Sequence, residues 1–446
     1  MTARTPPAVA SSASRRTESI PSSTAGTATS GAKTIATARP AGQADNSVVD
    51  ILHLLADDAE LTPEVCELVL AALEADAKSA DQTPALALFV KKLGNASGLV
   101  LEGDEWTRLW KICQRTIDQP MQTPELVSMM LGTVADLRGA LSRSGVLDAE
   151  RSTSILDYVK RHCADSDEAI RAAGVRVLGL LVLPADSAHI DTHQQQICDV
   201  LDDVLWGNPD KVSGGALHDS SSLVRQRASW AFSNAMEARL RAKAPLIEAD
   251  WTKYARYCLA AAKDIEGVAV SAYRTSGTLL ALLDLAFASK EGCFSLGRSL
   301  LEQLCRVLGT TSKPPKSKWN AASALDRALA SSVVMTHSLG SSASADGLVD
   351  KIVDSLCGSL TAKVFKIRVS AANALVSLCL DADKTPSQTS SSLRLEMLGE
   401  QRARKIRTVA MARLAELGEP ATSKEAALYV DELKRLLGTV VDTIPV

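Results

Sequence analysis

Apolar residues recur every three or four positions along most of the chain, beginning at Val48. The stretches "SVVDILHLLADD", "TPEVCELVLAALEADAKS" and "TPELVSMMLGTVADLRGAL" all show the i, i+3, i+4, i+7 spacing that predicts amphipathic helices. Thr62-Pro63 and Thr123-Pro124 supply a capping hydroxyl followed by proline at the first helical position. No stretch alternates with period two between hairpin turns, so an all-α chain is predicted. The helices are separated by polar breaks at 207–222, 309–317, 340–347 and 381–392.

Six of the predicted helices share one template. It has an apolar first place (Ser in one copy), usually a basic second place, a small fifth place and an apolar residue near the ninth place. The copies start 39 to 54 residues apart, close to the roughly 40–47 residues of HEAT and armadillo units. The first places are Ile170, Val224, Val268, Ser317, Ile367 and Ile406, and the fifth places are Gly174, Ala228, Ala272, Ala321, Ala371 and Ala410.

Small residues at a fixed place have a packing reason. Stacked helix pairs approach closely only where the facing residues are small, so the Gly/Ala column is interpreted as the stacking face. The predicted fold is a right-handed α-solenoid of HEAT/armadillo-like helical repeats.

The template stretches resemble HEAT repeats, and the family that they resemble is HEAT repeat-containing protein 6, over about 165–446. A HEAT repeat often pairs an Asp in its turn with the Arg of its second helix. Asp165 precedes Arg171 by six residues, and Asp219 precedes Arg225 by six; the other copies lack this Asp. The resemblance implies a scaffold or adaptor and no particular reaction or ligand. It is carried by 219–240 ("DSSSLVRQRASWAFSNAMEARL"), 316–329 ("KSKWNAASALDRAL") and 363–380 ("KVFKIRVSAANALVSLCL").

Three segments are expected from composition. Residues 1–46 are rich in Ala, Ser, Thr and Pro and nearly free of large apolar residues, which predicts a disordered tail. Five basic residues leave a mitochondrial transit peptide as the alternative, although prolines and glycines interrupt any amphipathic helix. Residues 47–164 form degenerate helical repeats with more acids than bases, suited to a basic partner. Residues 165–446 form the HEAT-repeat solenoid.

Charge and cysteine usage narrow the class of protein. The chain has 49 basic and 52 acidic residues, a formal charge of −3, which argues against a dedicated nucleic-acid binder. Nine cysteines scattered singly indicate buried reduced thiols and a cytoplasmic and/or nuclear location. We find no apolar run of about 18 residues and no secretory signal, so no membrane association is expected.

Polar side chains occupy the fourth, seventh and eleventh places of the template. At about 100° per residue, these places form one column beside the apolar stripe. Repeated amides, hydroxyls and guanidiniums suit an extended peptide backbone, whereas the alternative is an ordinary solvated helix flank. Trp230 and Asn234 resemble the tryptophan–asparagine pair of the importin-α armadillo groove. The residues predicted to bind a protein partner are Arg227, Trp230, Asn234, Arg274, Asn320, Arg327 and Asn373.

Two sets of basic residues have simpler interpretations. The second-place arginines are predicted to form salt bridges between repeats. The cluster at 402–407 is a candidate contact for an acidic partner, but such runs are usually solvated helix faces. The second-place arginines are Arg171, Arg225, Arg368 and Arg407, and the cluster is Arg402, Arg404, Lys405 and Arg407.

Candidate chemistry is sparse. His189 and His193 have the spacing of a zinc pair, but they lie in an expected loop and no third ligand is evident. We find no phosphate loop, dinucleotide turn or nucleophile elbow. No catalytic residue, cofactor, metal or small-molecule substrate is therefore predicted.

The leading hypothesis is a non-catalytic protein–protein interaction scaffold or adaptor. The alternatives are a transport receptor of the importin type that grips an extended basic peptide, and the regulatory subunit of an enzyme complex.

Overall fold

The computed structural model describes residues 55, 61–75, 82–95, 101–119, 123–145, 147–183, 192–207, 215–286, 291–339, 343–380, 393–417 and 424–445. Within these ranges every regular element is helical. The tail and transit-peptide hypotheses concern residues outside the described part, so they stay predictions.

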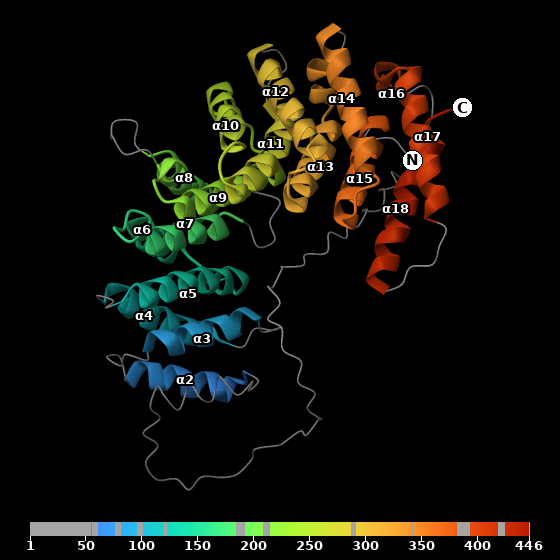
Figure 1. The fold of residues 1–446 in the computed structure, drawn as a ribbon. Helices are drawn as coiled ribbons and strands as arrows, with labels where there is room; N and C mark the ends of the chain where they lie inside the picture. Colours follow the sequence, from blue (N-terminus) through green and yellow to red (C-terminus); the bar gives the residue numbers. More distant parts are fainter. Residues whose placement is uncertain are drawn as a thin grey trace, which may run out of the picture. The chain divides into compact units, whose positions relative to one another are not determined.

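The helices pair in sequence order and form two layers, an α-solenoid of HEAT/armadillo type (Figure 1). Each first-layer helix packs against the second-layer helix that follows it. The first layer contains α2 (Pro63–Ala75), α4 (Gly103–Asp118), α6 (Ala149–His162), α8 (Thr192–Trp206), α10 (Glu248–Ala261), α12 (Glu291–Gly309), α14 (Ala343–Ser359) and α17 (Glu400–Glu416). The second layer contains α3 (Gln82–Asn95), α5 (Pro124–Arg143), α7 (Glu168–Leu181), α9 (Ser222–Arg241), α11 (Glu266–Ala286), α13 (Pro315–Ala330), α15 (Phe365–Cys379) and α18 (Lys424–Thr443).

Second-layer helices pack on one another without a break from α3 to α18. The helices α5 and α7 contact each other, so the second layer is continuous between residues 164 and 165, where the sequence pattern changes. Among the described residues, three short elements lie between the main helices. They are a 3₁₀ turn at Ala216–His218, a π-helix at Val334–Ser338 and α16 (Leu393–Leu398).

The predicted helix starts are confirmed at both Thr-Pro sites. The Thr62 hydroxyl accepts a hydrogen bond from the Val65 amide at 3.4 Å, and α2 begins at Pro63. The Thr123 hydroxyl accepts one from the Leu126 amide at 3.4 Å, and α5 begins at Pro124. Each hydroxyl satisfies an amide that has no partner inside the helix.

Two repeats approach closely at the tenth place of the template, which the sequence analysis did not single out. A Cβ on Gly179 would lie 2.7 Å from the Cβ of Ala231, and one on Gly277 would lie 2.6 Å from the Cα of Ala324. Tenth-place glycines therefore meet eighth-place alanines of the next repeat. The fifth-place Gly174 instead faces the turn after α6, so the predicted stacking residues were only partly right.

The sixth template copy lies in the first layer, whereas the other five lie in the second. The helix containing Ile406, α17, packs against α14 of the first layer, while α18 packs against α15 and completes the second layer. A helix that buries one apolar face produces the same pattern in either layer, so periodicity alone does not distinguish them.

Ion pairs between repeats join the ends of α7, α9 and α11. Arg171 is bidentate to Asp219, at 3.0 and 3.2 Å, and Arg225 is bidentate to Asp264, at 3.0 and 3.2 Å. Each guanidinium also donates to two carbonyls of its own turn. The predicted salt bridges are thus confirmed for these two arginines.

Arg368 and Arg407 do not continue this ladder. Arg368 lies over the Phe365 ring, 3.8 Å from its centroid. Arg407 donates to the Val441 carbonyl at 3.4 Å. The prediction of salt bridges for this pair was wrong, because the turns beside them lack the aspartate that Arg171 and Arg225 use.

Candidate partner-binding face

Trp230 and Asn234 lie over α7 rather than standing free. The Asn234 side-chain amide donates to the Gly179 carbonyl at 3.0 Å, and Asn234 is 1% exposed. The Trp230 ring lies beside the same glycine, where an added Cβ would be 2.9 Å from ring atom Cζ3. Because a Gly carbonyl here is bonded by a side chain of the next repeat, Asn234 stabilises the stacking of α7 on α9.

Next to this pair, side chains of three second-layer helices form a polar network around the carboxylate of Glu237. Arg327 of α13 donates to Glu237 of α9 at 2.5 Å and to the Thr278 hydroxyl of α11 at 2.7 Å. Arg241 lies 3.4 Å from the other oxygen of Glu237. Arg274 donates to the Asn234 side-chain oxygen at 3.3 Å. The network therefore runs from α9 across α11 to α13.

The network has more positive than negative charge. Burial opposes the ionisation of Glu237, but Arg327, Arg274 and Arg241 outweigh it and hold the pKa of Glu237 below its ordinary value. Desolvation lowers the pKa of Arg274, and Arg327 and Arg241 lower it further. Two guanidiniums, those of Arg327 and Arg241, pair with this carboxylate, and Arg274 adds to the positive charge near it. Arg327 and Arg241 keep 35% and 45% of their side chains exposed, so solvent reaches this positive charge.

The seven residues predicted to bind a partner differ in whether their side chains form hydrogen bonds or ion pairs within the protein. Asn234, Arg274 and Arg327 belong to the network, and the Asn320 amide donates to the Lys316 carbonyl in its own helix at 2.8 Å. Trp230, Arg227 and Asn373 are each half-buried. Of the described residues, none forms a hydrogen bond or ion pair with the side chain of Arg227 or Asn373. These two keep polar groups available on the face.

Glu237 and Arg241 were not among the predicted residues. They lie three and seven places after Asn234, hence on the same side of α9. From this spacing, the sequence could have placed Glu237 and Arg241 beside Asn234. The sequence could not predict the bond between Glu237 and Arg327, because these residues are 90 positions apart.

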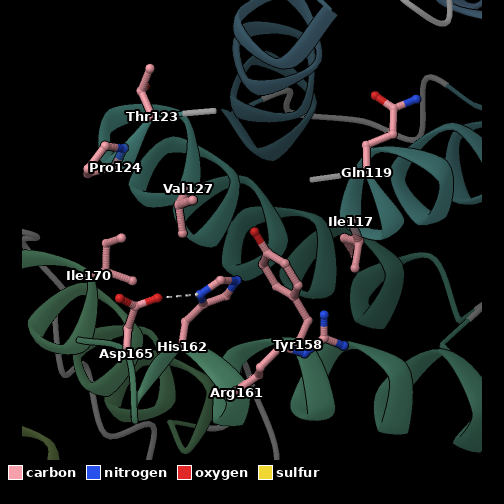
Figure 2. A pocket seen from close by; sticks show the side chains of 10 residues that line it. All are labelled: Ile117, Gln119, Thr123, Pro124, Val127, Tyr158, Arg161, His162, Asp165 and Ile170. Carbon is pink, nitrogen blue, oxygen red and sulfur yellow. Dashed lines mark ion pairs between the residues drawn. The ribbon is translucent and has the colours of Figure 1, made fainter. Parts of the chain in front are cut away.

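A separate pocket of about 320 Å³ opens between the ends of α4 and α6 and the starts of α5 and α7 (Figure 2). His162 Nδ1 lies 3.5 Å from Asp165 Oδ2, and the Tyr158 ring meets the imidazole edge-on at 4.8 Å between centroids. A histidine beside a carboxylate is a common catalytic arrangement, so the neighbouring groups decide its significance.

Two polar side chains of this pocket, Asp165 and Thr123, take part in the local fold. The Asp167 amide holds the pKa of Asp165 below its ordinary value, because it donates to that carboxylate at 2.9 Å. The Thr123 hydroxyl caps α5. None of the ten lining residues is Ser, Cys or Lys. The contact of His162 with Asp165 links the end of α6 to the turn before α7.

The remaining candidates give no chemical site. The side chains of His189 and His193 lie outside the described residues. Within the described part of the chain, no three His, Cys, Asp or Glu side chains come together as a metal site requires. Among the helices described, none is both long and apolar enough to cross a membrane. All nine cysteines are buried with free thiols.

The basic cluster at 402–407 is largely neutralised. Arg402 pairs with Asp350 at 2.6 Å and Lys405 with Asp354 at 2.5 Å, both across to α14. Arg404 pairs with Glu400 in its own helix. This agrees with the interpretation of the cluster as an ordinary charged helix face.

No protein-family model matches the chain, and no curated protein sequence matches it. Among solved structures, yeast importin-beta (Kap95p) is 12% identical with a TM-score of 0.47, over 90% of this chain and 50% of that one. A HEAT-like repeat protein of the archaeon Thermococcus onnurineus NA1 is 12% identical with a TM-score of 0.38, over 73% and 100%. A designed armadillo repeat protein in complex with the peptide (KR)4 is 14% identical with a TM-score of 0.36, over 60% and 100%. These TM-scores are below 0.5, so the fold assignment rests on the helix contacts.

Proposed function

We propose that the protein is a non-catalytic interaction scaffold or adaptor, related to HEAT repeat-containing protein 6, that holds a protein partner on α9, α11, α13 and α15. One observation carries this proposal: Arg241 and Arg327 share a single carboxylate, Glu237, with Arg274 close by, on a face that solvent reaches. A partner that supplies further acceptors would complete the bonding of these guanidiniums. Arg227 and Asn373 extend the same face at its two ends.

The excess of positive charge around Glu237 also helps to judge the two alternative functions, an importin-type receptor and a regulatory subunit. An importin-type receptor that grips a basic peptide needs carboxylates along its binding face, whereas this face would repel such a peptide. The role of regulatory subunit in an enzyme complex is compatible with a positive face, and it is a special case of the scaffold. Nine buried free thiols support a reducing location, the cytoplasm or nucleus. Nucleic acid, membrane and small-molecule partners are not part of this proposal.

The proposal is tested by charge reversal at Arg227. Affinity purification from the native cell, followed by quantitative mass spectrometry, compares three chains. They are the parent, the Arg227→Glu variant and the matched control variant Lys111→Glu. Lys111 is exposed on α4 of the first layer. We expect Arg227→Glu to reduce recovery of the partner at least about fivefold, as loss of a charged interface contact costs on the order of 1 kcal/mol or more. Equal recovery by all three chains, with helicity unchanged by circular dichroism, contradicts the proposed face.

A further inference from the structure

A second positive surface lies at the starts of α13 and α15, away from the Glu237 network. The stretches 310–325 and 360–376 contain six Lys and Arg residues and no Asp or Glu. We call this surface the basic edge. It consists of Lys313, Lys316, Lys318, Lys363, Lys366 and Arg368.

Contacts between the two helices gather these residues into one patch. The Lys366 ammonium lies over the Trp319 ring, 4.8 Å from its centroid. Further along the same helices, the hydroxyls of Ser323 and Ser370 are 3.0 Å apart. Because α13 and α15 are adjacent in the second layer, their first turns lie side by side.

The basic edge occupies the place that the Arg–Asp ladder occupies in earlier repeats. Asp264 stands in the turn before α11, five residues before the second template place, and pairs with Arg225 of the preceding repeat. Lys313 and Lys363 stand at the same place in the next two repeats. The sign of the charge in the turn is therefore reversed, and the ladder ends.

Four lysines of the basic edge lack an acidic partner within the described part of the chain. Lys313, Lys316, Lys318 and Lys363 form no ion pair with a described Asp or Glu. Lys316 and Lys363 are exposed. Burial lowers the pKa of Arg368, and the nearby Arg413 lowers it further. In the cluster at 402–407, by contrast, acids of α14 pair with Arg402 and Lys405.

We propose that the basic edge docks an acidic segment of a partner protein, one rich in Asp or Glu. This goes beyond the proposed function, because it concerns a different surface and states the chemistry of its occupant. Flexible lysines act as point charges and suit carboxylates without demanding a fixed geometry.

Aromatic contacts favour carboxylates over nucleic acid. Unpaired bases bind proteins largely by stacking on open aromatic rings. Here the Trp319 ring is covered by Lys366 and the Phe365 ring by Arg368. The formal charge of −3 for the whole chain also provides no broad positive field for a phosphate backbone.

The test measures binding of a fluorescein-labelled peptide of ten glutamates by fluorescence anisotropy at low salt. The test variant is Lys313→Glu, Lys316→Glu, Lys363→Glu. Its matched control, Lys91→Glu, Lys111→Glu, Lys263→Glu, makes the same change in net charge at three exposed lysines elsewhere. We expect the test variant to bind at least about tenfold more weakly than the parent, since three exposed ion pairs are replaced by repulsion. The control should bind within about twofold of the parent, and binding should weaken with salt.

Two further variants make the outcome decisive. Replacement of the same three lysines by arginine should preserve binding, and replacement by glutamine should give an intermediate loss even if the glutamate variant folds poorly. Equal binding by test and control variants overturns the proposal. So does tighter binding of a ten-nucleotide thymidine oligonucleotide than of the peptide. If Arg227→Glu abolishes peptide binding and the lysine variant does not, the acidic segment binds the α9–α15 face, which refutes the basic edge and leaves the proposed function standing.

Discussion

The close approach of α11 and α13 predicts the effect of one added methyl group. A Cβ on Gly277 would lie 2.6 Å from the Cα and 2.8 Å from the carbonyl oxygen of Ala324. Both atoms belong to the backbone of α13, so no rotation of a side chain relieves the contact. Gly277→Ala therefore requires the two helices to move apart.

The magnitude follows from two opposing effects. Overpacking of a close-packed interface costs about 1–3 kcal/mol. Replacing a helical Gly with Ala gains about 0.5–1 kcal/mol from backbone entropy and helix propensity. We expect a net loss of about 1–2 kcal/mol in the free energy of unfolding. Gly132, inside α5, has no atom within 4 Å of its added Cβ, so Gly132→Ala shows the gain alone.

The assay is urea unfolding followed by far-ultraviolet circular dichroism for the parent and both variants. Repeat arrays unfold with nearest-neighbour coupling, so the midpoint of the transition that includes α11–α13 is the quantity compared. The two glycine variants should shift in opposite directions. A Gly277→Ala chain as stable as Gly132→Ala would refute the Gly277–Ala324 packing and the register of the second layer.

Two further predictions concern buried groups. Glu237→Gln should cost about 2 kcal/mol at pH 7, less than a fully buried pair because Arg327 stays 35% exposed. Since the folded pKa of Glu237 lies below its ordinary 4.5, its contribution is complete above that pH and is lost as pH falls through the folded pKa. Urea midpoints of parent and variant should therefore converge on acidification, and equal midpoints at pH 7 contradict the network. Burial raises the pKa of Cys163 to about 12, and we expect none of the nine thiols to react promptly with Ellman's reagent until the chain is denatured; fast labelling of the native protein disproves their burial.

The site was harder to predict from sequence than the fold, for a specific reason. The template places of Asn234 and Arg327 predicted that both lie on the polar face. The sequence does not show which polar side chains form hydrogen bonds or ion pairs within the protein. Asn234 turned out to serve α7, 55 residues earlier in the chain. The lysines of the basic edge lie in two turns far apart in the sequence, so they form no visible run of charge. The bases at 402–407 do form such a run, although acids of α14 neutralise it.

By itself, the sequence determined that the chain is helical, where the Thr-Pro starts lie, and that helices of one template recur at the spacing of HEAT-type units. These properties depend on interactions within about four residues, so periodicity and capping reveal them. Only the tertiary structure decided that α17 belongs to the first layer, that Gly277 meets the backbone of α13, and that Arg274 and Arg327 reach polar side chains of α9. Those features depend on contacts between residues about 40 to 90 positions apart, and a pattern along the chain carries no record of which faces meet.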